Sequence, residues 1–275
     1  MNFFEDEYSY ENSCSLNQNL NFKYAEKIFA DNNVSFDKNN IKSLGIINSE
    51  EIYTGIGLLL ADECPNIIKI KYFSNNEPAL NNKLEFSGSI LKQLDDSYRY
   101  LEYFNNAHQT INSSYYKEKN NYPAIALREG LLNAAVHKDY SNPSEILIKI
   151  FNDHINILNS CSLNKDISID DIMIGFSSLI NPKLANIFCH INLIDSYGTG
   201  ITKIMQSYSK QQIKPKFEVT NRLFSLTLPN RNSKNGIGYH TDENDNLIKY
   251  IEDNDIVSRY DLQAKEKNTR YKIKS

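Results

Sequence analysis

Three polar residues recur at a spacing of four in the segment ALREGLLNAAVHKDY, which covers residues 126–140: Glu129, Asn133 and His137. On a helix this spacing places the three side chains in one stripe. Most other residues of the segment are apolar, as they are in a buried helix. The polar side chains therefore either satisfy one another in a core or face the polar part of a ligand.

Glu129 and Asn133 allow two interpretations. They could be a buried hydrogen-bonded pair, because burial demands partners for both groups. Alternatively, Glu129 is a general base that orients water, and Asn133 is a Mg²⁺ ligand beside phosphate groups. His137 and Asp139 are better explained as partners at the end of the helix, since nothing near them in the sequence supplies the nucleophile of a catalytic triad.

A second candidate site is the segment YGTGITKIM (197–205), in which Gly198 and Gly200 precede a predicted helix. Glycines allow backbone N–H groups to approach an anion closely, and the N-terminus of a helix favours negative charge. Lys203, in the first turn of this helix, could add a positive charge. An ordinary tight turn explains the same glycines, so the pattern alone leaves phosphate binding open.

The hydrophobic patterns around these segments predict the elements that position them. Helical periodicity predicts helices, besides the one with the polar stripe, at 22–32, 38–45, 53–64, 87–106, 164–174, 181–193 and 201–210. Alternation predicts strands at 66–74, 145–152, 154–159, 216–220 and 223–229. Asn152-Asp153 and Asn221-Arg222 are the expected turns of two hairpins. This order predicts an α+β fold with helices on one face of a mostly antiparallel sheet.

Composition excludes several classes of protein. The net charge of −4 over 275 residues and the pI of about 5.8 exclude a basic nucleic-acid coat, so any DNA contact would need a local patch. The four cysteines lack metal-ligand spacing and are expected to be free thiols in a reducing cytosol. No apolar run is long enough to span a membrane, and the acidic N-terminus is not a signal peptide. We therefore expect a soluble cytoplasmic protein.

The last part of the chain differs in composition from the rest. Residues 233–244 are polar and contain glycine, which is typical of a linker. Residues 245–275 resemble the first two helices of a winged helix-turn-helix module, and their last eighteen residues carry six Lys or Arg against two acids. We expect a partial winged helix, because no full recognition helix and wing follow.

Four segments, taken in order and spacing, resemble one bacterial family, the RecG-like transcriptional regulators. The segments are YPAIALREGLLNAAVHKDYS, INILNSCSL, GFSSLINPKLANIF and LIDSYGTGITKI. Members of the family usually combine an N-terminal AlbA-type (Schlafen-related) DNA-binding domain with a C-terminal GHKL-like ATPase domain. The resemblance implies a GHKL-like (Bergerat) α/β sandwich at residues 86–232, preceded at 1–85 by an α+β segment similar to the middle region of the family. The AlbA-type domain has no counterpart in this sequence.

The resemblance also implies roles for individual residues. In the GHKL superfamily, the helix with E-x-x-x-N supplies a general base and a Mg²⁺ ligand, which are Glu129 and Asn133 here. The later glycine turn folds over the phosphates of ATP, and the matching residues are Gly198, Thr199, Gly200 and Lys203.

The sequence departs from the superfamily pattern at the base and phosphate contacts. The Asp of D-x-G-x-G, which holds the adenine amino group, is Asn159 here, and an Asn can still accept from an amine. The two glycines of that motif are Cys161 and Leu163, and the family's usual Arg before Asn-Pro is Ile180.

Two functions follow from these observations. The first is an ATP-binding regulatory protein whose GHKL-like domain binds Mg²⁺ and ATP, with slow hydrolysis or none, and signals to a DNA-binding module. The second is a non-catalytic transcriptional regulator in which the ATPase-like fold serves for dimerisation. A helicase is not expected, because the sequence contains no G-x-x-x-x-G-K-[ST] motif. A homodimer would be typical of a regulator, although no residue of the sequence indicates one.

Overall fold

The computed structural model describes residues 9–74, 77–107, 120–161, 179–194, 198–220 and 222–233. The predicted helix at 164–174 lies outside the described residues, as do residues 234–244 of the predicted linker and the winged-helix segment at 245–275. Among the described residues, no helix combines the length and the apolar character needed to cross a lipid bilayer.

The described strands form one six-stranded sheet in the order β2-β1-β3-β4-β6-β5. Its strands are β1 (Ile68–Ser74), β2 (Glu77–Phe86), β3 (Ile146–Ile150), β4 (His154–Ser160), β5 (Lys216–Val219) and β6 (Leu223–Pro229). Only β1 and β3 pair in parallel, and the other neighbours are antiparallel. The two predicted hairpins, β3–β4 and β5–β6, are confirmed.

Strand β2 is absent from the elements that the sequence predicts. Its segment EPALNNKLEF contains proline and two asparagines, which are depleted in strands and enriched in turns. Pairing along β1, from Ile68 opposite Phe86 to Ser74 opposite Glu77, overrides this local preference. The strand lies at the edge of the sheet, where a proline is tolerated.

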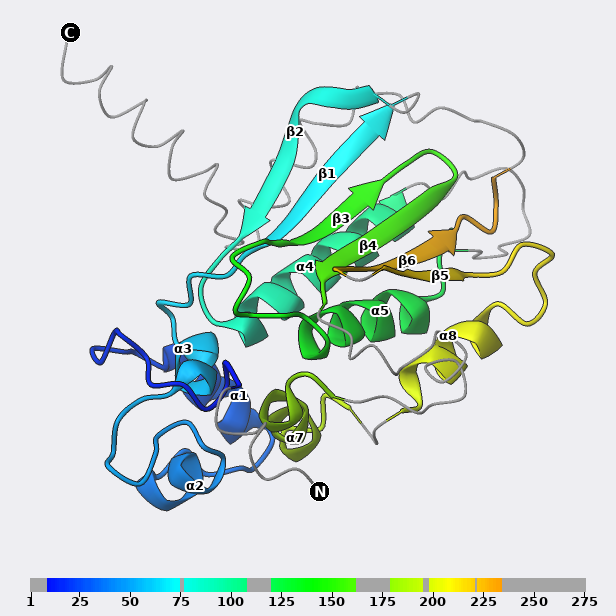
Figure 1. Cartoon of the computed structure of the whole chain (residues 1–275). Coiled ribbons are helices and arrows are strands. Elements are labelled where there is room, and N and C mark those ends of the chain that lie inside the picture. The colour runs from blue at the N-terminus through cyan, green and yellow to red at the C-terminus, as the bar shows by residue number, and fades with distance from the viewer. Residues whose placement is uncertain are drawn as a thin grey trace, which may run out of the picture.

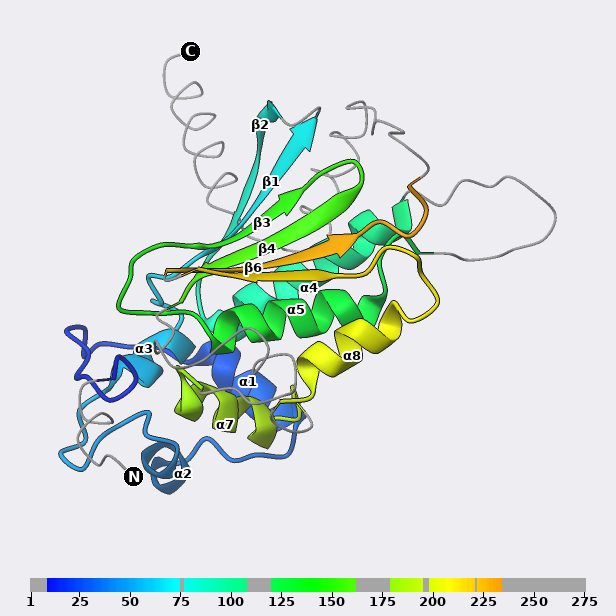
Figure 2. The ribbon, with the colours of Figure 1, turned by 45° about the vertical axis from the view of Figure 1, so that its right-hand side comes forward.

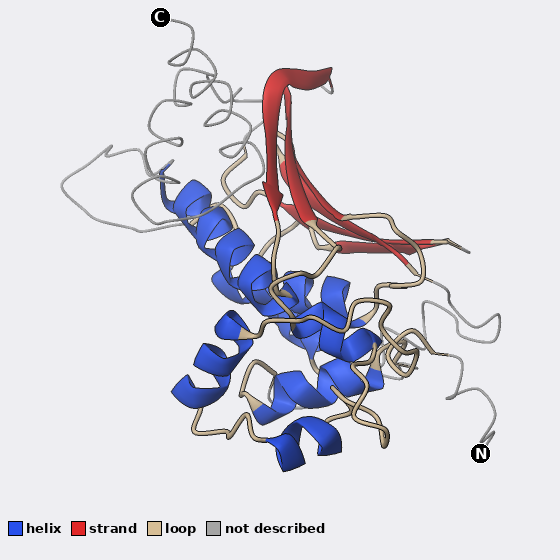
Figure 3. Ribbon diagram, turned by 90° about the vertical axis from the view of Figure 1, so that its left-hand side faces the viewer, coloured by secondary structure: helices blue, strands red, loops and turns tan. Residues whose placement is uncertain are grey.

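The helices lie on one face of the sheet, as the red and blue elements of Figure 3 show. The helices are α1 (Lys23–Asp31), α2 (Lys38–Ser43), α3 (Gly55–Leu60), α4 (Ile90–Ala107), α5 (Ala124–Val136), α7 (Pro182–His190) and α8 (Gly200–Ser207). In Figures 1 and 2, α4 and α5 run beneath the strands, and α8 lies beside α5. The predicted α+β class is confirmed, and the sheet joins strands from both sides of the predicted domain boundary at 85/86.

Helix α5 packs tightly against the sheet through Gly130. A Cβ at this position would lie 2.9 Å from Ile157 Cδ1 on β4 and 3.0 Å from Leu226 Cδ2 on β6. Most of the helix is buried, which agrees with its apolar sequence. Because Gly130 faces the sheet, the stripe of polar residues on α5 is directed toward a different neighbour, helix α8.

Residues 9–15, which we call the N-terminal strap, connect several of these helices. The Gly55 N–H, at the start of α3, donates to Ser13 O over 2.8 Å. The buried Glu11 carboxylate accepts hydrogen bonds from the backbone N–H groups of Lys183 (2.9 Å) and Leu184 (2.7 Å) in the first turn of α7. Burial raises the pKa of Glu11, whereas these two N–H groups lower it. The strap therefore ties α3 to the N-terminus of α7.

Candidate functional site

The start of helix α8 lies directly against the polar stripe of α5. A Cβ at Gly200 would lie 2.9 Å from Asn133 Nδ2, 3.0 Å from Asn133 Oδ1 and 3.1 Å from Glu129 Oε2. Real Cβ atoms rarely approach other atoms so closely, so the absence of a side chain at position 200 permits this contact. The two segments that the sequence singled out, 70 residues apart in the chain, therefore meet in space.

The Glu129 carboxylate is buried, with 3% of the residue exposed, and two cations contact it. The Lys203 ammonium on α8 and the Arg128 guanidinium on α5 each lie 3.3 Å from Glu129 Oε1. The second carboxylate oxygen, Oε2, faces Gly200. A buried carboxylate needs such partners, because an unpaired charge in a protein interior is costly. Lys203 and Arg128 are each about one-third exposed, so water reaches both cations.

The residues that precede α8 form the turn that the two glycines predict. Gly198 has φ of 78°, a left-handed conformation that a side chain rarely adopts. Thr199 then begins the helix, and its carbonyl accepts the first backbone hydrogen bond from the Lys203 N–H over 3.0 Å. Gly198 thus permits the turn, and Gly200 permits the approach to α5.

Asn159 lies on β4, on the strand face that is directed toward the helices. Its neighbour Ile157, two residues earlier on the same face, contacts Gly130 of α5. Asn159 is 1% exposed, and its Nδ2 donates to Ser160 O over 3.3 Å. Within the part of the chain that the structure describes, its Oδ1 has no hydrogen-bond partner. A buried carbonyl oxygen without a donor is rare in proteins and favours a polar ligand at this position.

Asn159 is also close in space to the residues that follow α5. The Asp139 N–H donates to Ser160 O over 2.8 Å, so the end of β4 lies beside the chain just after His137. The polar stripe therefore begins at Glu129 in the middle of α5 and continues through Asn133 toward the strand end that carries Asn159. No group of three or more metal-ligating His, Cys, Asp or Glu side chains occurs among the described residues.

His137 ends helix α5, and its backbone N–H donates to Asn133 O over 3.0 Å. Burial lowers the pKa of its ring from 6.5 to about 4, because the charged form loses hydration there. The ring is therefore neutral at pH 7. Asp139, its expected partner, accepts from the Ser141 N–H over 3.0 Å.

The pKa of His137 predicts a loss of stability in mild acid. The unfolded chain binds a proton below pH 6.5, whereas the folded ring resists protonation until about pH 4, so the free energy of unfolding falls between these values. We expect the wild type to lose on the order of 2 kcal/mol more than His137→Gln between pH 7 and pH 4.5, measured by urea unfolding. His190→Gln, at an exposed position on α7, is the control. Equal losses in wild type and His137→Gln would contradict the assignment.

Two residues that contact the site were not predicted from the sequence. Arg128 contacts Glu129 and also donates a hydrogen bond from Nη2 to Leu193 O, which follows α7. Asn181 donates from Nδ2 to Val136 O (2.8 Å) and Lys138 O (2.7 Å) at the end of α5. The segment around Asn181 was part of the quoted family pattern, but only the fold shows that this side chain holds α5. The four cysteines are free thiols, as predicted.

Comparisons with known proteins agree with an ATPase-type fold. Residues 144–228 match the family described as "Putative ATP-dependent DNA helicase recG C-terminal". A crystal structure of the DIP2311 protein from Corynebacterium diphtheriae is similar, with a TM-score of 0.66 and 19% sequence identity. The similarity covers 80% of this chain and 47% of that chain, so this chain spans about half the length of that protein. No curated protein matches the sequence.

The family match covers only part of the candidate site. It includes Asn159, the glycine turn and Lys203, but begins after α5, which carries Glu129 and Asn133. The described chain therefore contains a RecG C-terminal-like domain of the ATPase type, and the similarity to DIP2311 concerns the fold alone. The structure adds α5 to this domain, because α5 packs on β4 and β6 and contacts α8.

Proposed function

We propose that this protein is a regulator whose ATPase-type domain binds Mg²⁺ and ATP between helix α5, the turn before α8 and the end of β4. One observation carries the proposal. Gly200 of the glycine turn lies against both Glu129 and Asn133, so the two segments that the sequence singled out lie side by side, which supports the proposal. Because the two segments are far apart in the sequence, only the fold brings them together.

The residues present fit a nucleotide in two respects. The buried Asn159 Oδ1, without a donor among the described groups, is an acceptor that the adenine amino group would satisfy. The N-terminus of α8 lies beside Asn133, and a helix N-terminus favours an anion. The site thus offers an acceptor at its base end and donors at its phosphate end.

At the phosphate end of the proposed site, three residues of this chain would have different roles. Asn133 would supply an oxygen ligand to Mg²⁺, whose charge neutralises the phosphates. Lys203, which contacts Glu129 in this structure, would exchange that contact for a phosphate oxygen. Release of Lys203 would free Glu129 Oε1 to orient water, so hydrolysis would require this exchange. Because Glu129 has two competing cations, we expect slow hydrolysis at most.

The acceptor at Asn159 predicts a preference for adenine. We expect Mg²⁺-ADP to bind about tenfold more tightly than Mg²⁺-IDP, whose base carries a carbonyl oxygen in place of the amino group, since a buried unpaired group costs about 1–3 kcal/mol. Asn159→Ala should weaken ADP binding and leave IDP binding nearly unchanged. Calorimetric titration measures both affinities. Asn156→Ala, on the same strand but on its other face, is the matched control.

The two titrations distinguish a nucleotide-binding regulator from a non-catalytic one. A preference for ADP that Asn159→Ala removes supports the nucleotide site. No binding of either nucleotide at millimolar concentration would favour the second candidate, a non-catalytic regulator in which α8 packs permanently on α5. The departures from the superfamily pattern at Asn159, Cys161 and Ile180 are the observations that favour this second candidate.

The regulatory part of the proposal rests on the resemblance to RecG-like regulators. DNA is the proposed partner, through the segment at 245–275, whose last eighteen residues are basic, or through a domain outside this chain. A homodimer is the proposed assembly. A cytoplasmic location follows from such a role.

A further inference from the structure

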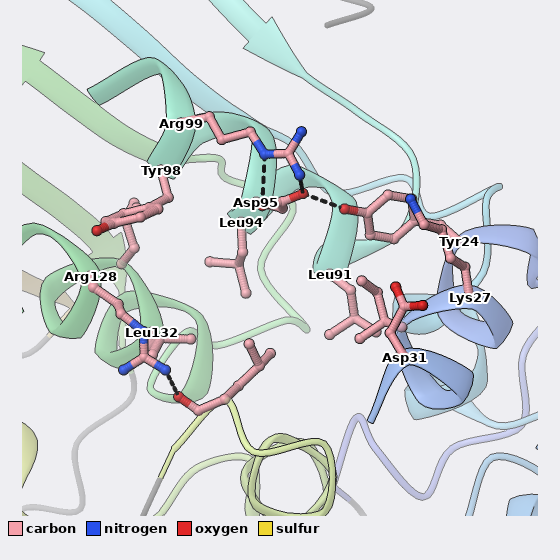
Figure 4. A pocket seen from close by; sticks show the side chains of 13 residues that line it. Tyr24, Lys27, Asp31, Leu91, Leu94, Asp95, Tyr98, Arg99, Arg128 and Leu132 are labelled. Carbon is pink, nitrogen blue, oxygen red and sulfur yellow. Dashed lines mark hydrogen bonds and ion pairs between the residues drawn. The ribbon is translucent and has the colours of Figure 1, made fainter. Parts of the chain in front are cut away.

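A pocket of about 310 Å³ lies on the side of α5 that carries Arg128, Leu131 and Leu132. Helices α1 and α4 and the segment after α7 form its other walls (Figure 4). This volume lies at the lower end of the range for small-molecule sites. Glu129, Asn133 and Gly200 are not among its lining residues, so the pocket adjoins the proposed nucleotide site, and Arg128 borders both.

The pocket has an apolar part beside its polar and charged groups. Six aliphatic side chains from three helices and one loop line it: Ile28, Leu91, Leu94, Leu131, Leu132 and Leu193. Such a surface favours the hydrocarbon part of a ligand, because its burial removes apolar area from water. Figure 4 shows leucine side chains between an α5 wall with Arg128 and an α1 wall with Tyr24 and Lys27.

One charged group of the pocket is already neutralised. The Asp95 carboxylate forms an ion pair with Arg99 at 2.9 Å and accepts a hydrogen bond from the Tyr24 hydroxyl over 2.6 Å. Burial of the ring, and then this hydrogen bond, raise the pKa of Tyr24, so its hydroxyl remains a donor to Asp95. Asp95 therefore does not need a cationic ligand.

Two cations of the pocket keep donor capacity. A guanidinium has five N–H donors, and Arg128 uses two of them in the contacts with Glu129 Oε1 and Leu193 O. Lys27 forms no ion pair with any described residue, and its ammonium has three donors. Lys27 and Asp31 lie four residues apart on α1 and are both exposed, so water reaches both groups. The remaining donors of Arg128 are therefore the main ones left for a ligand.

We infer that this pocket binds a small amphipathic anion, with its hydrocarbon part among the six aliphatic side chains and its acidic group on Arg128. Lys27, on the opposite wall, adds attraction at longer range. The ligand class is a carboxylate or sulfonate on an aromatic or branched aliphatic body. A guanidinium can donate two parallel hydrogen bonds to two oxygens of such an acidic group, which is a typical role of an arginine.

Two fluorescent probes test this inference without any nucleotide. Anilinonaphthalene sulfonate combines an apolar body with one anionic group, and phenylnaphthylamine has the same body without charge. We expect the sulfonate to bind the whole chain at one site, about tenfold more tightly than the neutral amine, because a charge-assisted hydrogen bond contributes more than 1 kcal/mol. Arg128→Gln should weaken the sulfonate about tenfold and leave the amine unchanged.

Matched variants separate the pocket from other apolar surfaces. Lys27→Gln should weaken the sulfonate about threefold, whereas Lys23→Gln, one turn earlier on α1 and outside the pocket, should change neither probe. Leu131→Phe should weaken both probes, because the larger ring occupies the cavity. Equal affinity for the two probes, or a sulfonate affinity that Arg128→Gln does not change, would overturn the inference. Because nucleotide is absent throughout, neither result depends on the proposed function.

Discussion

Gly55→Ala is expected to destabilise the protein by roughly 3–5 kcal/mol, at the upper end of what a single substitution does. The added Cβ would lie 1.9 Å from Tyr10 O and 2.9 Å from the Tyr10 carbonyl carbon, and neither backbone atom can move without the N-terminal strap. Displacement of the strap would also withdraw the Glu11 carboxylate from the N-terminus of α7. One methyl group thus disrupts contacts with two helices.

Thermal unfolding, monitored by circular dichroism, measures this loss of stability. A loss of this size corresponds to a decrease in Tm of about 10 °C for a domain of this length. Gly88→Ala is a useful control, since a Cβ at Gly88 would make only ordinary van der Waals contacts, although its φ of +92° is strained for alanine. We expect that variant to lose only about 1 kcal/mol. If Gly55→Ala were no less stable than Gly88→Ala, the position of the strap in this structure would be wrong.

Asn181→Leu is expected to cost about 2–4 kcal/mol and to loosen the end of α5. The Asn181 amide donates to Val136 O and Lys138 O, and Asn181 itself is buried with 1% exposed. Leucine fills a similar volume but donates no hydrogen bond, so two carbonyl groups at the end of the helix lose their donor. Because Asn133 lies one turn before this end, nucleotide affinity should fall together with stability.

The matched control is Asn186→Ala on the same helix. Asn186 is half-buried, and its side chain forms no hydrogen bond with the described residues, so the change should stay within about 0.5 kcal/mol. Urea unfolding gives both values, and amide hydrogen exchange of Val136, Lys138 and their neighbours reports the loosening. Unchanged exchange in Asn181→Leu, despite a lower stability, would contradict the role of Asn181 in holding α5.

Much of the layout around the site could be predicted, because its signals are local. The hairpins β3–β4 and β5–β6 follow from short alternating runs around polar turns, and α5 follows from its apolar sequence. Spacing alone placed Glu129 and Asn133 on one side of that helix. The positive φ of Gly198 likewise follows from a glycine at the start of a helix.

The parts that could not be predicted depend on contacts between distant segments. Strand β2 exists because β1 pairs with it, although its own residues favour a turn. The contacts of Lys203 and Arg128 with Glu129 require α8 and α5 to be packed together. The hydrogen bonds of Glu11 could not be predicted either, since its partners on α7 are about 170 residues away in the chain. Local patterns predict elements, whereas these ion pairs and caps are decided by packing.

One calorimetric titration decides whether α5 and the glycine turn form a nucleotide site. The purified chain is titrated with a non-hydrolysable ATP analogue, with and without Mg²⁺, alongside Asn133→Ala. We expect binding that strengthens at least tenfold with Mg²⁺ in the wild type and loses this dependence in Asn133→Ala, because Asn133 would supply a metal ligand. No detectable heat at millimolar analogue, or an equal effect of Mg²⁺ in both proteins, would contradict this expectation.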